Sequence, residues 1–351
     1  MSVKTRILIV SDTHNQTFEI KDIHKTADIV IHCGDLSLYS DVADYQRVLD
    51  TMCQLPAPLK LCIAGNHDLG IDDGNFDKHL ASKLDMNVRW GRNKAEEEVK
   101  KEFGPPGEPR RLLAAAAKAG GVQFLEEGNH EFKLRNGASL RLYASPYTPA
   151  KWTGRAYQYT YEEGHEFAIA DNTQIVVTYG PPRGILDYTD GNQRAGCPQL
   201  YTAVAQTRPL IHCFGHIHEA WGCKFVHWKE ASSSSTGTRR SARLKDSPHN
   251  DMDADKTVVL EQIQDLFAQK GDNAEVTQAK AAKRAEYERL GYYYTSHCAG
   301  DARPITQGKQ TLILNASYDY SESKKHILQH QWPFVVDIEL PIAKDGQKPC
   351  A

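Results

Sequence analysis

The sequence predicts an α/β fold in which buried strands alternate with helices. Short, continuously apolar runs recur along the chain and each stops at polar residues, which is typical of strands buried on both faces. Segments with helical potential separate the first runs, and this alternation favours βαβ units with right-handed crossovers. Because sites in such sheets form beyond the carboxyl ends of the strands, we expect the functional residues where the runs end.

The first apolar runs lie within the first hundred residues. They span residues 6–10, 28–32 and 59–64, and a helix is expected at 41–54. Polar residues follow each predicted strand directly: Asp12 and His14 after the first, Asp35 after the second, and Asn66, His67 and Asp68 after the third. These strand ends therefore collect carboxylates and imidazoles at one edge of the predicted sheet.

The middle of the chain changes character. Residues 97–118 predict a helix on the strength of an alanine run, with an interruption at 104–107. Residues 131–134 and 139–143 alternate around Arg135-Asn136-Gly137 and predict a β-hairpin. The aromatic, proline-stiffened loop at 145–152 is expected to pack, although it could flank a pocket. Further strands are predicted at 122–125, 174–178, 209–214, 223–228, 311–316 and 334–340.

We expect a single domain over residues 1–345, interrupted by a low-complexity insert at about 229–300. The insert holds a serine run, a basic patch and an acidic stretch, a composition that buries little apolar surface. Disorder is therefore expected from about residue 231 to 255, and a charged helix near 277–289.

Composition excludes several classes of partner. Lysine and arginine total 42 against 45 aspartate and glutamate, which leaves a net charge of −3. So small a charge offers no long-range attraction for a nucleic-acid polymer or an anionic membrane, and any phosphate must be bound locally. No stretch approaches the roughly 18 apolar residues of a membrane span, and no export signal is visible. The eight cysteines are scattered without a CxxC pair, so we expect reduced thiols and a cytoplasmic protein.

A local signal for chemistry is Gly215-His216-Ile217-His218, directly after the run 209–214. Two imidazoles on a glycine turn at a strand end suit metal ligation better than core packing. Together with the strand-end residues above, they form an oxygen and nitrogen ligand set for divalent metals such as Mn, Fe, Zn or Mg.

Two metal ions suit this ligand set better than one. A carboxylate can bridge two cations roughly 3.5 to 4 Å apart that together hold a phosphate ester, and Asp35 is the candidate bridge. Each residue taken alone has an ordinary alternative: Asp12 as a turn residue, Asn66 as a helix cap, His67 as a surface histidine. The combination of all of them is what indicates a metal centre.

The motifs and their order resemble those of the calcineurin-like metallophosphoesterases. The family pattern D-x-H, G-D, G-N-H-[DE] and G-H-x-H is intact at Asp12-Thr13-His14, Gly34-Asp35, Gly65-Asn66-His67-Asp68 and Gly215-His216-Ile217-His218. The intervening Gly180-Pro181-Pro182 and Gly196-Cys197-Pro198 are most similar to the branch of brain metallophosphoesterase-domain proteins and their fungal relatives. The resemblance covers residues 6–228 and about 309–340. It implies a four-layer αββα sandwich of two mixed sheets with a dimetal centre at the loop ends.

The resemblance also implies a role for each site residue. The first metal ion would be held by Asp12, His14, Asp35 and His218, and the second by Asp35, Asn66, His216 and the residue at position 179. His67 would stand beside the scissile ester without binding metal, stabilising the transition state or protonating the leaving oxygen. Asp68 would orient the His67 ring.

Tyr179 departs from the family pattern, which has histidine before Gly-Pro-Pro. A neutral phenol is a poor ligand, because it binds a metal well only after losing a proton whose reference pKa is near ~10. Two interpretations stay open: Tyr179 weakens the second metal site, or it ligates as phenolate.

The expected function is hydrolysis of a small phosphodiester or nucleotide by a metal-dependent phosphoesterase, attenuated if Tyr179 weakens the second site. One alternative keeps the metals as Lewis acids for a nonphosphorylated metabolite, with Tyr147, Trp152 and Trp221 near the mouth of the site. Another is a one-metal binding module in which the insert recruits a partner.

Overall fold

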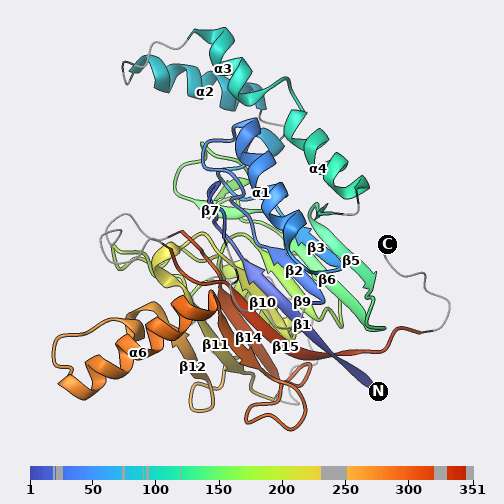
Figure 1. Cartoon of the computed structure of the whole chain (residues 1–351), viewed down its shortest axis with the longest axis vertical. Coiled ribbons are helices and arrows are strands. Elements are labelled where there is room, and N and C mark those ends of the chain that lie inside the picture. Colours follow the sequence, from blue (N-terminus) through green and yellow to red (C-terminus); the bar gives the residue numbers. More distant parts are fainter. Residues whose placement is uncertain are drawn as a thin grey trace.

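A computed structural model describes residues 1–18, 20, 27–72, 76–89, 91, 95–119, 121–230, 251–319 and 330–344 of the 351-residue chain. Two β-sheets lie at its centre and helices lie outside them (Figure 1). Both sheets are mixed, because a block of parallel strands in each is flanked by antiparallel neighbours.

The six-stranded sheet has the order β13-β15-β1-β2-β3-β4. Its strands are β1 (Ser2–Val10), β2 (Ile29–His32), β3 (Leu59–Cys62), β4 (Gln123–Phe124), β13 (Tyr293–Ser296) and β15 (Phe334–Pro341). From β1 to β4 neighbouring strands pair in parallel, whereas β15 pairs with β1 antiparallel. The carboxyl ends of β1, β2 and β3 therefore meet at one edge.

The seven-stranded sheet has the order β12-β11-β14-β10-β9-β6-β5. Its parallel block is β6 (Ser139–Ser145), β9 (Ile175–Thr178), β10 (Ile211–Phe214) and β14 (Gln310–Asn315). The antiparallel strands are β5 (Gly128–Lys133), β11 (Gly222–His227) and β12 (Val258–Gln262). Two short strands, β7 (Thr148–Ala150) and β8 (Gln158–Thr160), form a separate ribbon.

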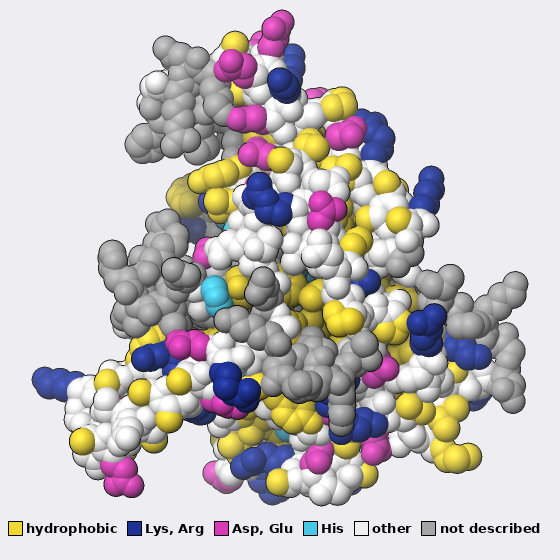
Figure 2. All heavy atoms as spheres, in the orientation of Figure 1, with side chains coloured by type: hydrophobic (Ala, Val, Ile, Leu, Met, Phe, Trp, Pro, Cys, Tyr) yellow, Lys and Arg dark blue, Asp and Glu magenta, His cyan; other side chains and the backbone are white. Residues whose placement is uncertain are grey.

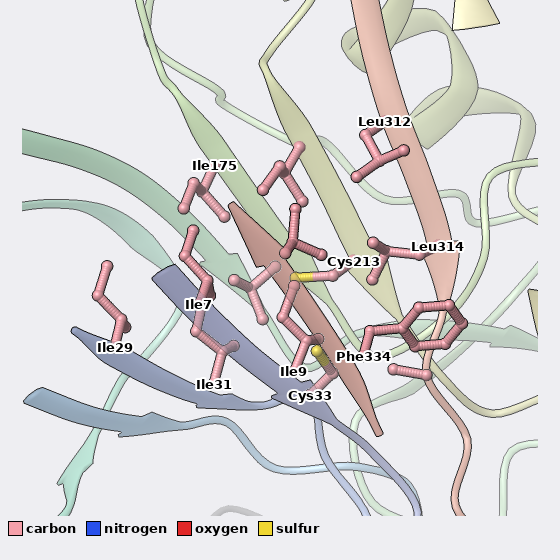
Figure 3. Packing of buried hydrophobic residues seen from close by; sticks show 14 of the residues in the cluster. Ile7, Ile9, Ile29, Ile31, Cys33, Ile175, Cys213, Leu312, Leu314 and Phe334 are labelled. Carbon is pink, nitrogen blue, oxygen red and sulfur yellow. The ribbon is translucent and has the colours of Figure 1, made fainter. Parts of the chain in front are cut away.

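The largest hydrophobic cluster lies between the two sheets. Ile7 and Ile9 of β1 face inward and share this cluster with Ile175, Cys213 and other residues of the second sheet (Figure 3). The alternate residues of β1, Leu8 and Val10, join a different cluster on the outer face. Because successive side chains of a strand point to opposite faces, burial on both sides explains why β1 is apolar without interruption from Ile7 to Val10.

Helices cover both outer faces. α1 (Val42–Gln54) and α4 (Glu108–Lys118) pack on the six-stranded sheet, and α5 (Pro198–Thr207) packs on the seven-stranded sheet. α1 buries side chains at a helical spacing, Tyr45, Val48, Leu49 and Met52. The layers thus run helix, sheet, sheet, helix, which confirms the predicted αββα sandwich.

The helix predicted at 97–118 is two helices. α3 (Glu96–Phe103) ends at Gly104, whose φ of 70° breaks the helical path, and α4 begins after Gly107. α3 packs with α2 (Phe76–Arg89), which was not predicted, around Phe76, Val99 and Phe103. This pair lies beyond α1 and α4 at one end of the molecule (Figure 1).

The expected low-complexity insert at about 229–300 differs from the structure from residue 251 onward. Residues 231–250 lie outside the described residues, but 251–300 are built into the fold. β12 extends one sheet and β13 the other, and between them lies the predicted charged helix, α6 (Ala274–Leu290). Met252 is buried in the cluster under α5, so the disorder expected as far as residue 255 is wrong from residue 251 onward. The polar composition of this region concealed its two short strands.

No helix within the described residues is both long and apolar enough to cross a membrane. Basic and acidic side chains are interspersed over the face shown in Figure 2, in keeping with the small net charge. Trp221, which was expected near the mouth of the site, is instead buried in the core between the sheets, where its indole N–H donates to the Trp332 carbonyl. Trp152 is 80% exposed.

Candidate metal centre

The predicted site residues meet where parallel strands of both sheets end. Their positions are Asp12 and His14 after β1, Asp35 after β2, Asn66 and His67 after β3, Tyr179 after β9, and His216 and His218 after β10. Backbone hydrogen bonds join these ends: Ser11 donates to the Ala316 carbonyl across the two sheets (2.9 Å), and Gly215 donates to the Tyr179 carbonyl (3.1 Å). The site is therefore built by the sheet framework itself.

The backbone is strained at this point. Asp12, His14, Asp35 and His216 have φ values of 51°, 45°, 52° and 72°, in the left-handed region that residues with a Cβ rarely adopt. Each costs on the order of 1–3 kcal/mol, and such residues persist where the surroundings hold them and cluster at functional sites. Here the Asp12 amide donates to the Gly34 carbonyl (2.9 Å) and the His14 amide to the Asp35 carbonyl (3.2 Å).

One half of the centre brings together two imidazoles and two carboxylates. The Nε2 atoms of His14 and His218 lie 3.3 Å apart. His218 Nε2 is 3.4 Å from Asp12 Oδ1, and His14 Nε2 is 3.6 Å from Asp35 Oδ2. Ligand atoms of Asp12, His14 and His218 all lie within 4.8 Å of one another. We call Asp12, His14, Asp35 and His218 the first half.

The donor chemistry of the first half fits a metal ion. His14 Nδ1 is 3.3 Å from the Ser37 carbonyl, and as a donor there it leaves an Nε2 lone pair directed at His218. A ring nitrogen held by a backbone carbonyl is the usual support of a metal-binding histidine. Asp12 is fixed in the same way, because its Oδ2 accepts from the His216 amide (2.9 Å) and the Ser317 hydroxyl (3.0 Å).

The electrostatics of the first half also favour a cation. Burial alone would raise the pKa of Asp12, but the hydrogen bond and charge of His218 lower it well below its usual range. Burial lowers the pKa of His218, yet the bond and charge of Asp12 outweigh this and raise it to about 9. For Asp35, burial and the Asp12 charge raise the pKa to about 6. Two buried carboxylates are thus only partly compensated, and a divalent ion would stabilise both in the ionised form.

The other half surrounds the Tyr179 hydroxyl. Its oxygen is 2.5 Å from Asp35 Oδ2, 2.8 Å from Asn66 Oδ1 and 3.0 Å from His216 Nδ1. Burial, followed by the charges of Asp35 and Asp12, raises the pKa of Tyr179 well above 10. The Tyr179 hydroxyl therefore lies among the residues expected to hold a second metal. We call Asn66, Tyr179 and His216 the second half.

His67 lies beside the first half, but Asp68 does not orient it. His67 Nδ1 is 2.8 Å from the Leu38 carbonyl, which fixes the ring. The Asp68 carboxylate instead accepts from the backbone of Leu36, Ser37 and Gly65, and from the Ser37 hydroxyl. The expected orienting role of Asp68 is therefore wrong: this carboxylate organises the loops that carry Asp35 and Asn66. A ligand atom of His67 also lies within 4.8 Å of those of His14 and Asp35.

Arg155 is a residue of the site that sequence reasoning missed. Its guanidinium contacts His67 Nε2. The neighbouring Ala156 amide donates to the Asn66 carbonyl (3.2 Å), so the loop that carries Arg155 is tied to the centre. Burial, His14 and Arg155 lower the pKa of His67 to about 3. Arg155 lies outside every metal motif, and the sequence signalled this loop only through its prolines and aromatics.

Comparison with known proteins identifies the family of the chain. Residues 5–220 match the calcineurin-like phosphoesterase family. A probable rhamnogalacturonate lyase C of Emericella nidulans is 30% identical over 231 residues, which are 64% of this chain and 18% of that protein. Metallophosphoesterase domain-containing protein 1 of Homo sapiens is 27% identical over 230 residues, 62% of each chain. The chain thus spans less than two thirds of the length of these relatives.

Among solved structures, TT1561 of Thermus thermophilus is similar with a TM-score of 0.36 at 13% identity, over 61% of this chain and 82% of that one. The sequence matches to the human and fungal relatives confirm the predicted branch. The family match spans β1 to β10 and every predicted metal ligand. The chain belongs to the calcineurin-like phosphoesterase family.

Proposed function

We propose that this chain is a metal-dependent phosphoesterase that hydrolyses a small phosphodiester or nucleotide. The observation that supports this most directly is the first half, in which two imidazole Nε2 atoms and two carboxylates converge beside His67 and Arg155. Nitrogen and carboxylate donors of this kind suit Mn, Fe or Zn, and Mg is also possible.

A cation held by Asp12, His14, Asp35 and His218 would supply a Lewis acid that neutralises charge on a phosphate oxygen and activates water. Proton transfer and phosphate binding would be carried out by two side chains, His67 and Arg155. The Leu38 carbonyl holds the His67 ring against that of His14, so His67 stands beside the first half, where it can share a proton with an ester oxygen. Arg155 offers a planar set of N–H donors, which match the oxygens of a phosphate.

The position of Arg155 favours a small substrate. A net charge of −3 gives no broad attraction for a polymer of phosphates, so a local cation must select the ligand. Arg155 and the 80% exposed Trp152 lie on the same loop, where a cation and an aromatic ring could receive a phosphate and a base. The cysteines of the described chain are free thiols, which supports the proposal of a reducing, cytoplasmic setting.

The proposal is tested by turnover. Metal-free protein is titrated with MnCl₂ while hydrolysis of an aryl phosphodiester, an aryl phosphomonoester and cyclic nucleotides is followed. We expect diester hydrolysis that rises and saturates with metal. Bound metal without turnover of any phosphate ester would contradict the proposal and favour chemistry on a nonphosphorylated metabolite.

Arg155 provides a sharper test. Arg155→Gln should raise KM for the diester about 10-fold or more, because one good charged hydrogen bond is worth ~1.5–3 kcal/mol, and should leave metal affinity unchanged. Lys151→Gln is the matched control, since it removes the same charge from an exposed position on the same loop. Equal effects of the two changes would show that Arg155 contributes only general charge.

A further inference from the structure

We propose that the Tyr179 hydroxyl takes the place of a second cation, so that the centre holds one divalent metal ion, in the first half. This inference rests on the proposed metal site of Asp12, His14, Asp35 and His218, and it is independent of the substrate. It also resolves the choice left open by the sequence, between a weakened second site and phenolate ligation.

The geometry around the hydroxyl carries the inference. Asp35 Oδ2, Asn66 Oδ1 and His216 Nδ1 all lie within 3.0 Å of the phenol oxygen. A metal ion bound by oxygen and nitrogen atoms sits ~2.0–2.2 Å from each of them. The point that a cation would need to share with these three groups is therefore the point that the hydroxyl occupies.

The hydroxyl also satisfies these three groups. A phenol has one proton to donate and lone pairs to accept hydrogen bonds. The shortest contact, to Asp35, takes the proton, and His216 donates to the oxygen from Nδ1. The Asn66 side chain completes the set when its amide nitrogen faces the phenol, since the two ends of an amide have the same shape. In that orientation the side chains of Asp35, Asn66 and His216 each have a partner without a metal ion.

The ring cannot move aside to admit a cation. Tyr179 is 1% exposed and its ring lies against the glycines of two metal motifs. A Cβ on Gly34 or Gly65 would lie 2.6 Å from ring carbons Cδ2 or Cε2, so the ring fills the space that these glycines leave. Its backbone is held on both sides, by the Ser145 carbonyl (3.0 Å) and the Gly215 amide (3.1 Å).

The charge balance agrees with a single ion. Asp12 and Asp35 supply two negative charges and both belong to the first half, where one divalent cation would neutralise them. Asn66, His216 and Tyr179 add no negative charge when neutral, so leaving out a second cation exposes no unpaired buried carboxylate. Asp35 then joins the metal to the Tyr179 hydroxyl instead of bridging two metals.

Metal counting tests the inference. Metal-free wild-type protein and Tyr179→His are dialysed against MnCl₂ and analysed for bound manganese, and the electron paramagnetic resonance spectrum shows whether two ions are coupled. We expect one equivalent in the wild type. Tyr179→His should bind two coupled ions, because a neutral imidazole is shorter than a phenol and offers a lone pair, and its turnover should rise at least ~10-fold.

Each outcome has a distinct meaning. Two equivalents in the wild type would overturn the inference and leave the proposed function intact, whereas no bound metal would overturn the proposed metal site itself. A folded Tyr179→His that still binds one ion would also overturn the inference, because another feature must then exclude the second ion. If that variant does not fold, the wild-type count decides.

Discussion

The two halves of the metal centre have similar residues but different organisation. In the first half, the Nε2 atoms of His14 and His218 face each other at 3.3 Å between two carboxylates, an arrangement of donors that suits a cation. In the second half, Asn66 and His216 are already partnered by the Tyr179 hydroxyl. Four intact motifs therefore do not determine how many ions are bound, because Tyr179, which lies outside them, occupies the second half.

The largest effect is expected at Asp35, the residue of the first half that also contacts the Tyr179 hydroxyl of the second half. Asp35→Asn removes the negative charge that Asp35 offers to the metal and weakens the acceptor of the Tyr179 proton, so bound manganese and turnover should both be lost. Metal analysis and diesterase activity are measured on protein whose melting confirms that it is folded. A variant that retained its metal would show that Asp35 is not a ligand.

The two histidines of the Gly215–His218 turn separate the halves most cleanly. His218→Ala should weaken manganese binding at least ~100-fold, whereas His216→Ala should change it by less than about threefold, because only His218 belongs to the first half. Titration calorimetry measures both, and each variant serves as the control for the other. Equal losses would mean that both halves bind metal and would remove the contrast between them.

His67 should affect turnover without affecting metal content. His67→Ala is expected to lower kcat by the ~10² to 10⁴ typical of a lost acid or base, with one manganese ion still bound. A ligand atom of His67 lies within 4.8 Å of those of His14 and Asp35, so His67 is close enough to be a metal ligand itself. The metal measurement distinguishes that role from a purely catalytic one. Loss of the ion would assign His67 to the ligands of the first half.

The smallest effect is expected far from the centre. Deleting residues 232–250 should leave melting and metal content nearly unchanged, because the Lys229 amide donates to the Asp251 carbonyl (2.8 Å) and two residues can close that turn. Deleting 232–255 should instead lower stability by ~2–5 kcal/mol, since it removes the buried Met252. Equal melting temperatures of the two deletions would show that residues 251–255 contribute nothing to the fold.

Much of the fold was predictable, for a physical reason that β1 illustrates. Ile7 and Leu8 point to opposite faces that are both buried. A strand buried on both faces needs apolar residues at every position, so it is visible in the sequence as an unbroken apolar run. β12 and β13 show no such apolar run, because they are edge strands in a polar region and are only partly buried. Their place in the sheets is decided by pairing with distant strands, which local composition does not report.

That the candidate site residues meet was predictable, whereas the contacts among them were not. Asp12 and His218 stand in motifs whose spacing marks strand ends, so their meeting was expected. The position of the Tyr179 hydroxyl depends on how β9 stands beside β10, and the contact of Arg155 with His67 depends on a loop outside the motifs. The role expected for Asp68 was wrong because adjacency in sequence to His67 does not fix which backbone amides a carboxylate reaches.

The count and position of bound ions test the central claim most directly. Crystals grown with manganese and measured for anomalous scattering should show one peak per chain, between the Nε2 atoms of His14 and His218 and beside Asp12 and Asp35. The Tyr179 hydroxyl should remain in contact with Asn66 and His216. A second peak within bonding distance of those two residues, ~2.2 Å, would contradict the account.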